Sequence, residues 1–107
     1  MEIRPDRHDG HNNLGICYEN QGKLNEAIAC YQKAIEVASK SLQYAKPYNN
    51  LGMIEMNRGR LDKAKGLFSR SIEINPRQTF AFIKLGVCYA RMGQFTEAIR
   101  KWRKALQ

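Results

Sequence analysis

The chain has 107 residues, of which 43% are hydrophobic and 26% charged, and its net charge is +8 at pH 7. This length suits one small domain, and the hydrophobic fraction is enough for a core, which excludes a wholly disordered chain. No apolar stretch is long enough to span a membrane, and no secretory leader opens the sequence. The three cysteines include no C-x2-C pair, which argues against a disulfide framework or a zinc site. We therefore expect a soluble, cytoplasmic chain.

The positive charge is concentrated in the second part of the chain. Residues 1–44 contain five Lys or Arg and six Asp or Glu, a net charge of −1, whereas residues 45–107 contain thirteen and four, a net charge of +9. This asymmetry indicates a surface for an acidic partner within residues 45–107.

Five features recur in the same order three times along the chain. A Leu-Gly pair begins at Leu14, Leu51 and Leu85, with spacings of 37 and 34 residues. Each pair is followed by a glycine, an alanine and then an aromatic residue: Gly22, Ala27 and Tyr31; Gly59, Ala64 and Phe68; Gly93, Ala98 and Trp102. Three copies in register identify a repeat protein.

Each unit is predicted to contain two helices joined at a glycine. In the first unit, apolar residues at helical spacing from Leu14 to Tyr18 indicate one helix, and Gly22 ends it in the left-handed conformation. An apolar stripe from Ala27 to Ile35 indicates the second. We expect the Leu-Gly glycines where the two helices approach most closely. The expected caps of the second helices are Asn25, Asp62 and Thr96.

These units resemble the tetratricopeptide repeat, a 34-residue helix-turn-helix with the pattern W-x2-L-G-x2-Y, then A-x3-F, then P. The matching blocks begin at His11, Tyr48 and Phe82, and Pro76 is the terminal proline of the second unit. The resemblance implies an all-α, right-handed solenoid of tandem repeats that binds other proteins. One departure is Glu55 at a tyrosine position, which indicates either local exposure or a polar partner.

The predicted units are residues 8–44, 45–78 and 79–107, preceded by residues 1–7, which match the tail of a preceding repeat. The first unit is three residues longer than standard, and its second helix is expected to continue toward Lys40. The third unit is truncated, and neither end has the polar face of a capping element. We therefore expect a fragment of a longer array, with a complete three-repeat protein as the alternative.

The first helices of stacked units line the concave side of such a solenoid, so one face of each is predicted to point inward. The predicted peptide-binding residues on this face are Asn12, Asn13, Ile16, Asn49, Asn50, Met53, Lys84 and Val87. A carboxamide can pair with both groups of a peptide bond, so the repeated Asn-Asn pairs favour recognition of an extended backbone. This arrangement is similar to the asparagine ladder of superhelical family members. Solvated surface asparagines are the alternative.

Apolar residues accompany the asparagines. Ile16, Met53 and Val87 are predicted to form a strip, which serves either an apolar ligand side chain or packing between repeats. Another groove known in the resembled family clamps the C-terminal carboxylate of chaperones with two lysines, two asparagines and an arginine. The corresponding residues here are Asn12, Ile16, Asn50, Ile83 and Val87. Only Asn50 matches, which disfavours the clamp.

Other chemistry is not supported by the sequence. His8, Asp9 and His11 lack further neighbouring ligands, and no set of a nucleophile and a base can be assembled, so we predict no metal, cofactor or catalysis. The spacing of the basic residues on the last helix places them on its outer face, which is expected to be solvated. No aromatic residue is interleaved with them on the exposed side, which disfavours nucleic acid. The cysteines are expected to be buried free thiols.

The predicted function is a non-enzymatic protein–protein interaction scaffold whose concave groove binds an extended peptide or a partner helix. The partner is expected to be a protein or peptide, of acidic character because of the basic second part of the chain. Two alternatives remain open: self-association through uncapped repeat ends, and a substrate-recruiting arm of a larger enzyme.

Overall fold

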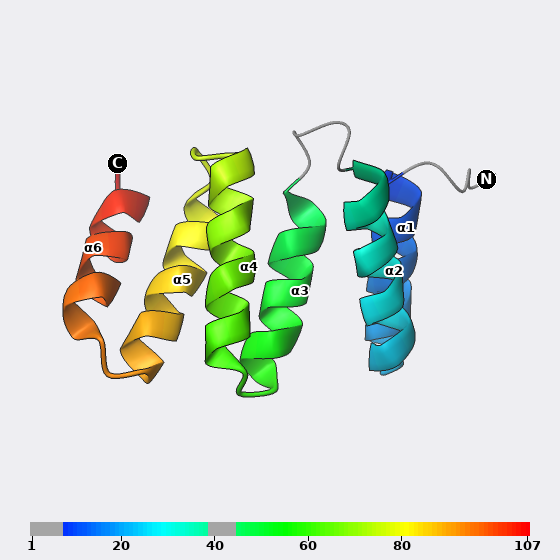
Figure 1. The fold of residues 1–107 in the computed structure, drawn as a ribbon, viewed down its shortest axis with the longest axis horizontal. Coiled ribbons are helices and arrows are strands. Elements are labelled where there is room, and N and C mark those ends of the chain that lie inside the picture. The colour runs from blue at the N-terminus through cyan, green and yellow to red at the C-terminus, as the bar shows by residue number, and fades with distance from the viewer. Residues whose placement is uncertain (1–7, 39–44) are drawn as a thin grey trace.

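The computed structural model describes residues 8–38 and 45–107, and these ranges contain six α-helices and no strand (Figure 1). The helices are α1 (His8–Asn20), α2 (Leu24–Ala38), α3 (Lys46–Asn57), α4 (Leu61–Ile74), α5 (Thr79–Arg91) and α6 (Phe95–Ala105). In the described part of the chain, no helix has the length and apolar character needed to cross a membrane. The predicted all-α repeat solenoid is confirmed.

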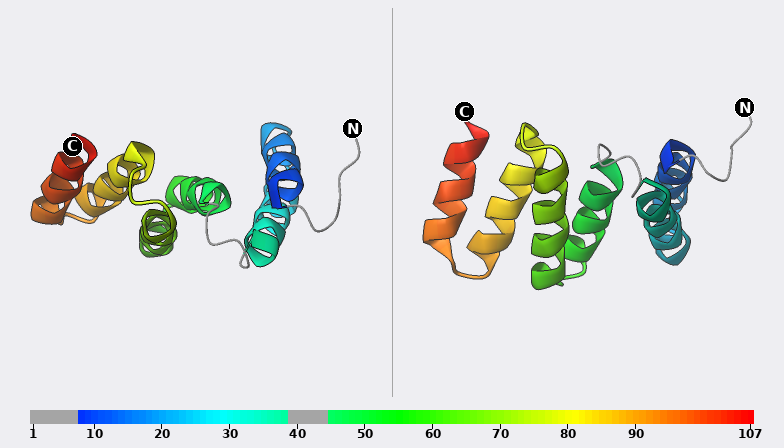
Figure 2. Two further views of the ribbon diagram at one scale, coloured as in Figure 1. Left: turned by 90° about the horizontal axis from the view of Figure 1, so that it is seen from above. Right: turned by 45° about the horizontal axis from the view of Figure 1, so that its top comes forward.

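The helices pair in chain order, α1 with α2, α3 with α4 and α5 with α6, and the pairs follow one another along a molecule of 46 × 27 × 18 Å (Figure 1). The two junctions between pairs differ. α4 packs on α5 more extensively than α2 packs on α3. Figure 2 shows that the α1–α2 pair is also turned relative to the other two pairs. The first junction is therefore the more open one.

Glycines with positive φ end the first helix of each pair. Gly22, Gly59 and Gly93 have φ angles of 78°, 79° and 78°, the left-handed conformation predicted for them. The predicted caps are wrong, because the next helix begins only two residues after each glycine, at Leu24, Leu61 and Phe95. Asn25, Asp62 and Thr96 therefore lie inside the first turn. The residues before α4 and α6, Arg60 and Gln94, form no side-chain cap bond.

The Leu-Gly glycines lie where the helices of a pair approach most closely, as predicted. A Cβ atom at Gly15 would lie 2.6 Å from Cε1 of Tyr31, and one at Gly52 would lie 2.8 Å from Cε1 of Phe68. Gly86 faces the indole of Trp102 in the same way. The repeated aromatic residue, rather than the repeated alanine, is thus the neighbour that excludes a side chain at the glycine.

Two core clusters join neighbouring pairs. One contains Ala27 and Tyr31 of α2 with Leu51 and Ile54 of α3. The other joins the second and third pairs and consists of Met56, Ala64, Phe68, Leu85 and Cys88. Each cluster spans one junction, so every unit depends on its neighbour for burial, as in other solenoids.

Some predictions differ from the structure or fall outside it. Cys88 is buried as expected, but Cys30 is only partly buried and Cys17 is exposed, because α1 packs mainly on its partner α2 at one end of the array. The predicted repeat tail at residues 1–7 and the predicted continuation of α2 into Ser39 and Lys40 lie outside the described residues.

Candidate peptide-binding groove

Five of the eight predicted groove residues line one pocket. This pocket has a volume of about 320 Å³ and lies between α1, α3 and the start of α5. The lining residues are Asn12, Asn13, Ile16, Lys46, Asn49, Asn50 and Phe80. On α3, Lys46, Asn49 and Asn50 share one side because residues three and four apart lie one above the other on a helix. The asparagines of two units therefore face a common space.

The asparagines of α1 differ in their exposure. Asn12 is 1% exposed, and its Oδ1 accepts a hydrogen bond of 2.8 Å from Nδ2 of Asn50. Asn13 is exposed at the surface of the pocket. Asn12 thus connects α1 to α3, whereas Asn13 presents its carboxamide outward.

Asn49 belongs to a chain of hydrogen bonds that reaches α4. Its Nδ2 donates to Oε1 of Gln78 at 2.7 Å, and Nε2 of Gln78 donates to Oγ of Ser71 at 2.6 Å and to the Ser71 carbonyl at 2.8 Å. Oδ1 of Asn49 is buried and accepts no hydrogen bond from the described residues. Gln78 was missed from the sequence because it precedes α5, where the repeat has no signature residue.

Phe80 and Lys84 supply an aromatic face and a cation beside the asparagines. The Phe80 side chain is 44% exposed, and its ring meets the Phe68 ring edge-on at a centroid distance of 6.5 Å. Nζ of Lys84 lies 5.6 Å from the Phe80 centroid, within the range of a cation–π contact. Lys84 itself is not among the residues that line the pocket.

The predicted apolar strip is divided by the structure. Met53 and Val87 pack against the core cluster of the second junction and lie outside the pocket, which favours inter-repeat packing for these two residues. Ile16 is 39% exposed and lines the pocket. The apolar groups at this pocket are therefore Ile16 and Phe80.

Glu55 lies elsewhere on α3 and is buried, with 3% of its surface exposed. Nη1 of Arg58 donates to its Oε1 at 3.3 Å, and Nζ of Lys63 lies 3.2 Å from its Oε2. Of the two explanations predicted for the missing tyrosine, the polar partner is confirmed and the local exposure is wrong.

Comparison with known proteins identifies the family. One tetratricopeptide repeat model matches residues 6–77, and a second matches residues 79–107. The chain belongs to the tetratricopeptide repeat family, whose repeats generally act as non-enzymatic protein-interaction scaffolds. No curated protein matches the chain.

Several solved structures have a similar fold. A crystal structure of MamA has 27% sequence identity and a TM-score of 0.88, over 96% of this chain and 58% of the MamA chain. Another MamA protein structure has 27% identity and a TM-score of 0.85, over 95% of this chain and 54% of that one. The chain thus spans less than two thirds of the length of these relatives.

A third similar structure carries a ligand. It is the second TPR of Spaghetti (RPAP3) bound to the HSP90 peptide SRMEEVD. This structure has 20% identity and a TM-score of 0.85, over 95% of this chain and 92% of that one. At this identity the likeness shows the fold alone.

Proposed function

We propose that the concave groove between α1, α3 and α5 binds an extended acidic segment of a partner protein. The observation that carries this proposal is the pocket that gathers four asparagines from two repeats around a buried acceptor without a hydrogen bond. In such a groove the carboxamides read the peptide backbone, and one apolar side chain of the partner packs on Ile16 and Phe80.

The unpaired acceptor favours a ligand that brings N–H groups. A buried carbonyl oxygen without a hydrogen bond costs about 1–3 kcal/mol, so a donor that reaches Oδ1 of Asn49 recovers part of this free energy. A peptide backbone offers N–H groups at regular intervals, and the exposed carboxamide of Asn13 pairs with the adjacent peptide unit. An extended segment can supply both the donor for Oδ1 of Asn49 and the peptide unit for Asn13, because its own backbone groups are unpaired.

The charge of the groove favours an acidic segment. Lys46 lines the pocket and Lys84 stands beside it on Phe80, whereas none of the described residues that line the pocket is acidic. Complementary charge accelerates association and excludes basic partners. An extended segment with carboxylates next to an apolar side chain fits both properties of this surface.

The proposal is tested by selecting peptides on the 107-residue chain and measuring their affinity for two variants. Asn13→Ala combined with Asn49→Ala removes the two carboxamides assigned to the peptide and should weaken binding about tenfold, since each lost hydrogen bond contributes about 0.5–1.5 kcal/mol. The control, Asn25→Ala with Gln94→Ala, removes two exposed carboxamides outside the groove and should leave affinity unchanged. Circular dichroism verifies that helicity is retained. Equal affinities of the two variants, or selection of basic peptides, would contradict the proposal.

Salt separates groove recognition from attraction to the basic surface in general. Raising ionic strength from about 0.05 M to about 0.5 M shortens the screening length several-fold. Binding through carboxamides and apolar contacts should persist at the higher ionic strength, with only a modest loss of affinity. Complete loss of binding would contradict the proposal, because it would mean that surface charge in general, rather than the groove, binds the peptide.

A further inference from the structure

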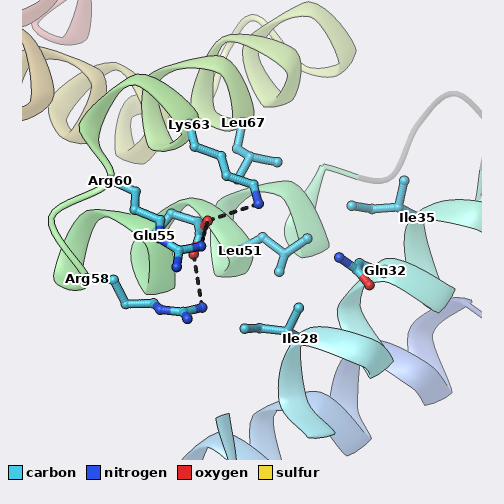
Figure 3. A pocket seen from close by; sticks show the side chains of 9 residues that line it. All are labelled: Ile28, Gln32, Ile35, Leu51, Glu55, Arg58, Arg60, Lys63 and Leu67. Carbon is cyan, nitrogen blue, oxygen red and sulfur yellow. Dashed lines mark hydrogen bonds and ion pairs between the residues drawn. The ribbon is translucent and has the colours of Figure 1, made fainter. Parts of the chain in front are cut away.

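A second pocket of about 370 Å³ lies between α2 and the α3–α4 pair (Figure 3). Its apolar walls are Ile28 and Ile35 of α2, Leu51 of α3 and Leu67 of α4. Because residues are about 100° apart around a helix, Leu51 and Glu55 lie on the side of α3 opposite to Asn49 and Asn50. This pocket is therefore separate from the concave groove.

The pocket is located where one residue departs from the repeat. Glu55 occupies the position that Tyr18 and Tyr89 hold in the other units, three residues after the Leu-Gly glycine. At the second junction the Tyr89 ring packs against the core cluster, and Nζ of Lys65 lies 5.0 Å from the centroid of that ring. At the first junction the ring is absent and α2 packs less extensively on α3. A glutamate in place of a tyrosine thus leaves an open volume between apolar walls.

Positive charge exceeds negative charge around this volume. Three cations surround the one carboxylate: Arg58 donates to Oε1 of Glu55, while Arg60 and Lys63 lie 3.7 Å and 3.2 Å from Oε2. Oε2 makes no hydrogen bond within the described residues, although both cations are close. The side chains of the three cations remain between 36% and 60% exposed. With one carboxylate among three cations, two positive charges at the pocket remain uncompensated.

We propose that this pocket binds one apolar side chain of a partner peptide that carries carboxylates on both sides of it. The walls receive the apolar side chain, and a volume of about 370 Å³ lies within the range of ligand pockets. Two flanking carboxylates match the two uncompensated charges as charge-assisted contacts. Gln32, which also lines the pocket, pairs with the peptide backbone through its carboxamide. The proposal does not rest on the concave groove.

The direct test uses short capped peptides and methyl resonances of the 107-residue chain. The probe is acetyl-Asp-Asp-Phe-Asp-Asp-amide, and two control peptides replace either Phe by Ser or every Asp by Asn. The probe should shift the methyl resonances of Ile28, Ile35 and Leu51, with both controls bound at least about tenfold more weakly. Shifts confined to Ile16 and Ile83, on the concave side, would overturn the proposal, as would no shift at millimolar probe.

Two variants test the roles of the volume and of the charge. Glu55→Tyr restores the repeat residue and fills the pocket, so it should weaken the probe at least about tenfold. Lys63→Ala removes one exposed cation and should weaken binding of the probe peptide up to about fivefold. The control Lys104→Ala removes the same charge from α6 and should leave the affinity unchanged. Thermal melting verifies folding of each variant. Equal effects of the two lysine variants, or unchanged affinity of folded Glu55→Tyr, would overturn the proposal.

A small amphiphilic anion could also combine an apolar group with a carboxylate in this pocket, so it is compared with the peptide. Octanoate carries an apolar chain and one carboxylate but no peptide groups for Gln32 and no second charge. It should bind at least about tenfold more weakly than the probe peptide. Octanoate binding as tight as that of the peptide would overturn the assignment of a peptide ligand.

Discussion

The carboxamide of Asn50 donates a hydrogen bond of 2.8 Å to Oδ1 of the buried Asn12 and so connects α3 to α1. Removing the donor leaves a buried acceptor unpaired, which costs about 1–3 kcal/mol. Asn50→Ala should therefore lower the free energy of unfolding by that amount in urea titrations. Asn13→Ala, at an exposed neighbouring position, should lower it by less than about 0.5 kcal/mol. Equal losses would mean that the Asn50–Asn12 hydrogen bond contributes nothing to stability.

A second prediction concerns the closest approach within the α3–α4 pair. A Cβ at Gly52 would lie 2.8 Å from the Phe68 ring, so Gly52→Leu should lower the free energy of unfolding by about 1–3 kcal/mol through overpacking. Gly66→Leu makes the same change on an exposed face of α4, where nothing lies within 4 Å of the new Cβ. This control should stabilise the helix by up to about 1 kcal/mol. Thermal melting distinguishes the two, and a silent Gly52→Leu would contradict the packing described here.

The sequence predicted the fold well because repetition marks the positions that matter. The Leu-Gly glycines and the aromatics Tyr31 and Phe68 are constrained by direct contact, and the turn glycines by positive φ, so each recurs in every unit. The prediction that Asn25, Asp62 and Thr96 cap the second helices was wrong. Such residues are favoured as caps on average, but the short link after each turn glycine makes the helix begin two residues after that glycine.

The candidate sites were predicted less completely, because they depend on contacts between units. Five of the predicted groove residues line one pocket, because the Leu-Gly register and helical spacing place them on the same side of α1 and α3, and their binding of a peptide stays a prediction. The bond from Asn49 to Gln78 crosses between α3 and the residue that precedes α5, and no repeat pattern encodes it. Glu55 stands out in the sequence as a departure from the repeat. Its pairing with Arg58 and Lys63 follows from the turn that returns α4 beside α3.

A third prediction concerns alkaline pH. Burial, and then the hydrogen bond that Tyr31 donates to Glu19 at 2.7 Å, raise the pKa of Tyr31 above its ordinary value of 10.0. The unfolded chain loses this proton near pH 10 while the folded chain keeps it, so the folded state binds more protons above pH 10. The contribution of Tyr31 to stability is therefore complete below pH 10 and is lost as pH rises further.

The measurement compares the wild type with Tyr31→Phe in urea titrations at about pH 9 and about pH 11. The wild type should lose up to about 1.4 kcal/mol more per pH unit than the variant above pH 10. Identical slopes in the two proteins would show that Tyr31 titrates alike in the folded and unfolded states.

A fourth prediction concerns peptides that end in a carboxylate. At the five positions of the chaperone clamp only Asn50 matches, and its Nδ2 already donates to Asn12. An acidic peptide selected on this chain should therefore bind with the same affinity, within about twofold, whether its C-terminus is free or amidated. Isothermal titration of both forms gives the comparison. A loss of about tenfold on amidation would reveal a carboxylate clamp that these residues do not provide.

The most direct test of the concave groove is a nuclear magnetic resonance titration of the ¹⁵N-labelled chain with its best selected acidic peptide. Binding there should shift the side-chain amide resonances of Asn13 and Asn49 and the backbone amide of Phe80. The backbone amide resonances of Ile28 and Ile35, which line the second pocket, should stay unchanged with a peptide that occupies the groove alone. Shifts confined to α2, α4 and α6, with the asparagine amides unmoved at saturation, would contradict the claim that the asparagine-lined groove is the binding surface.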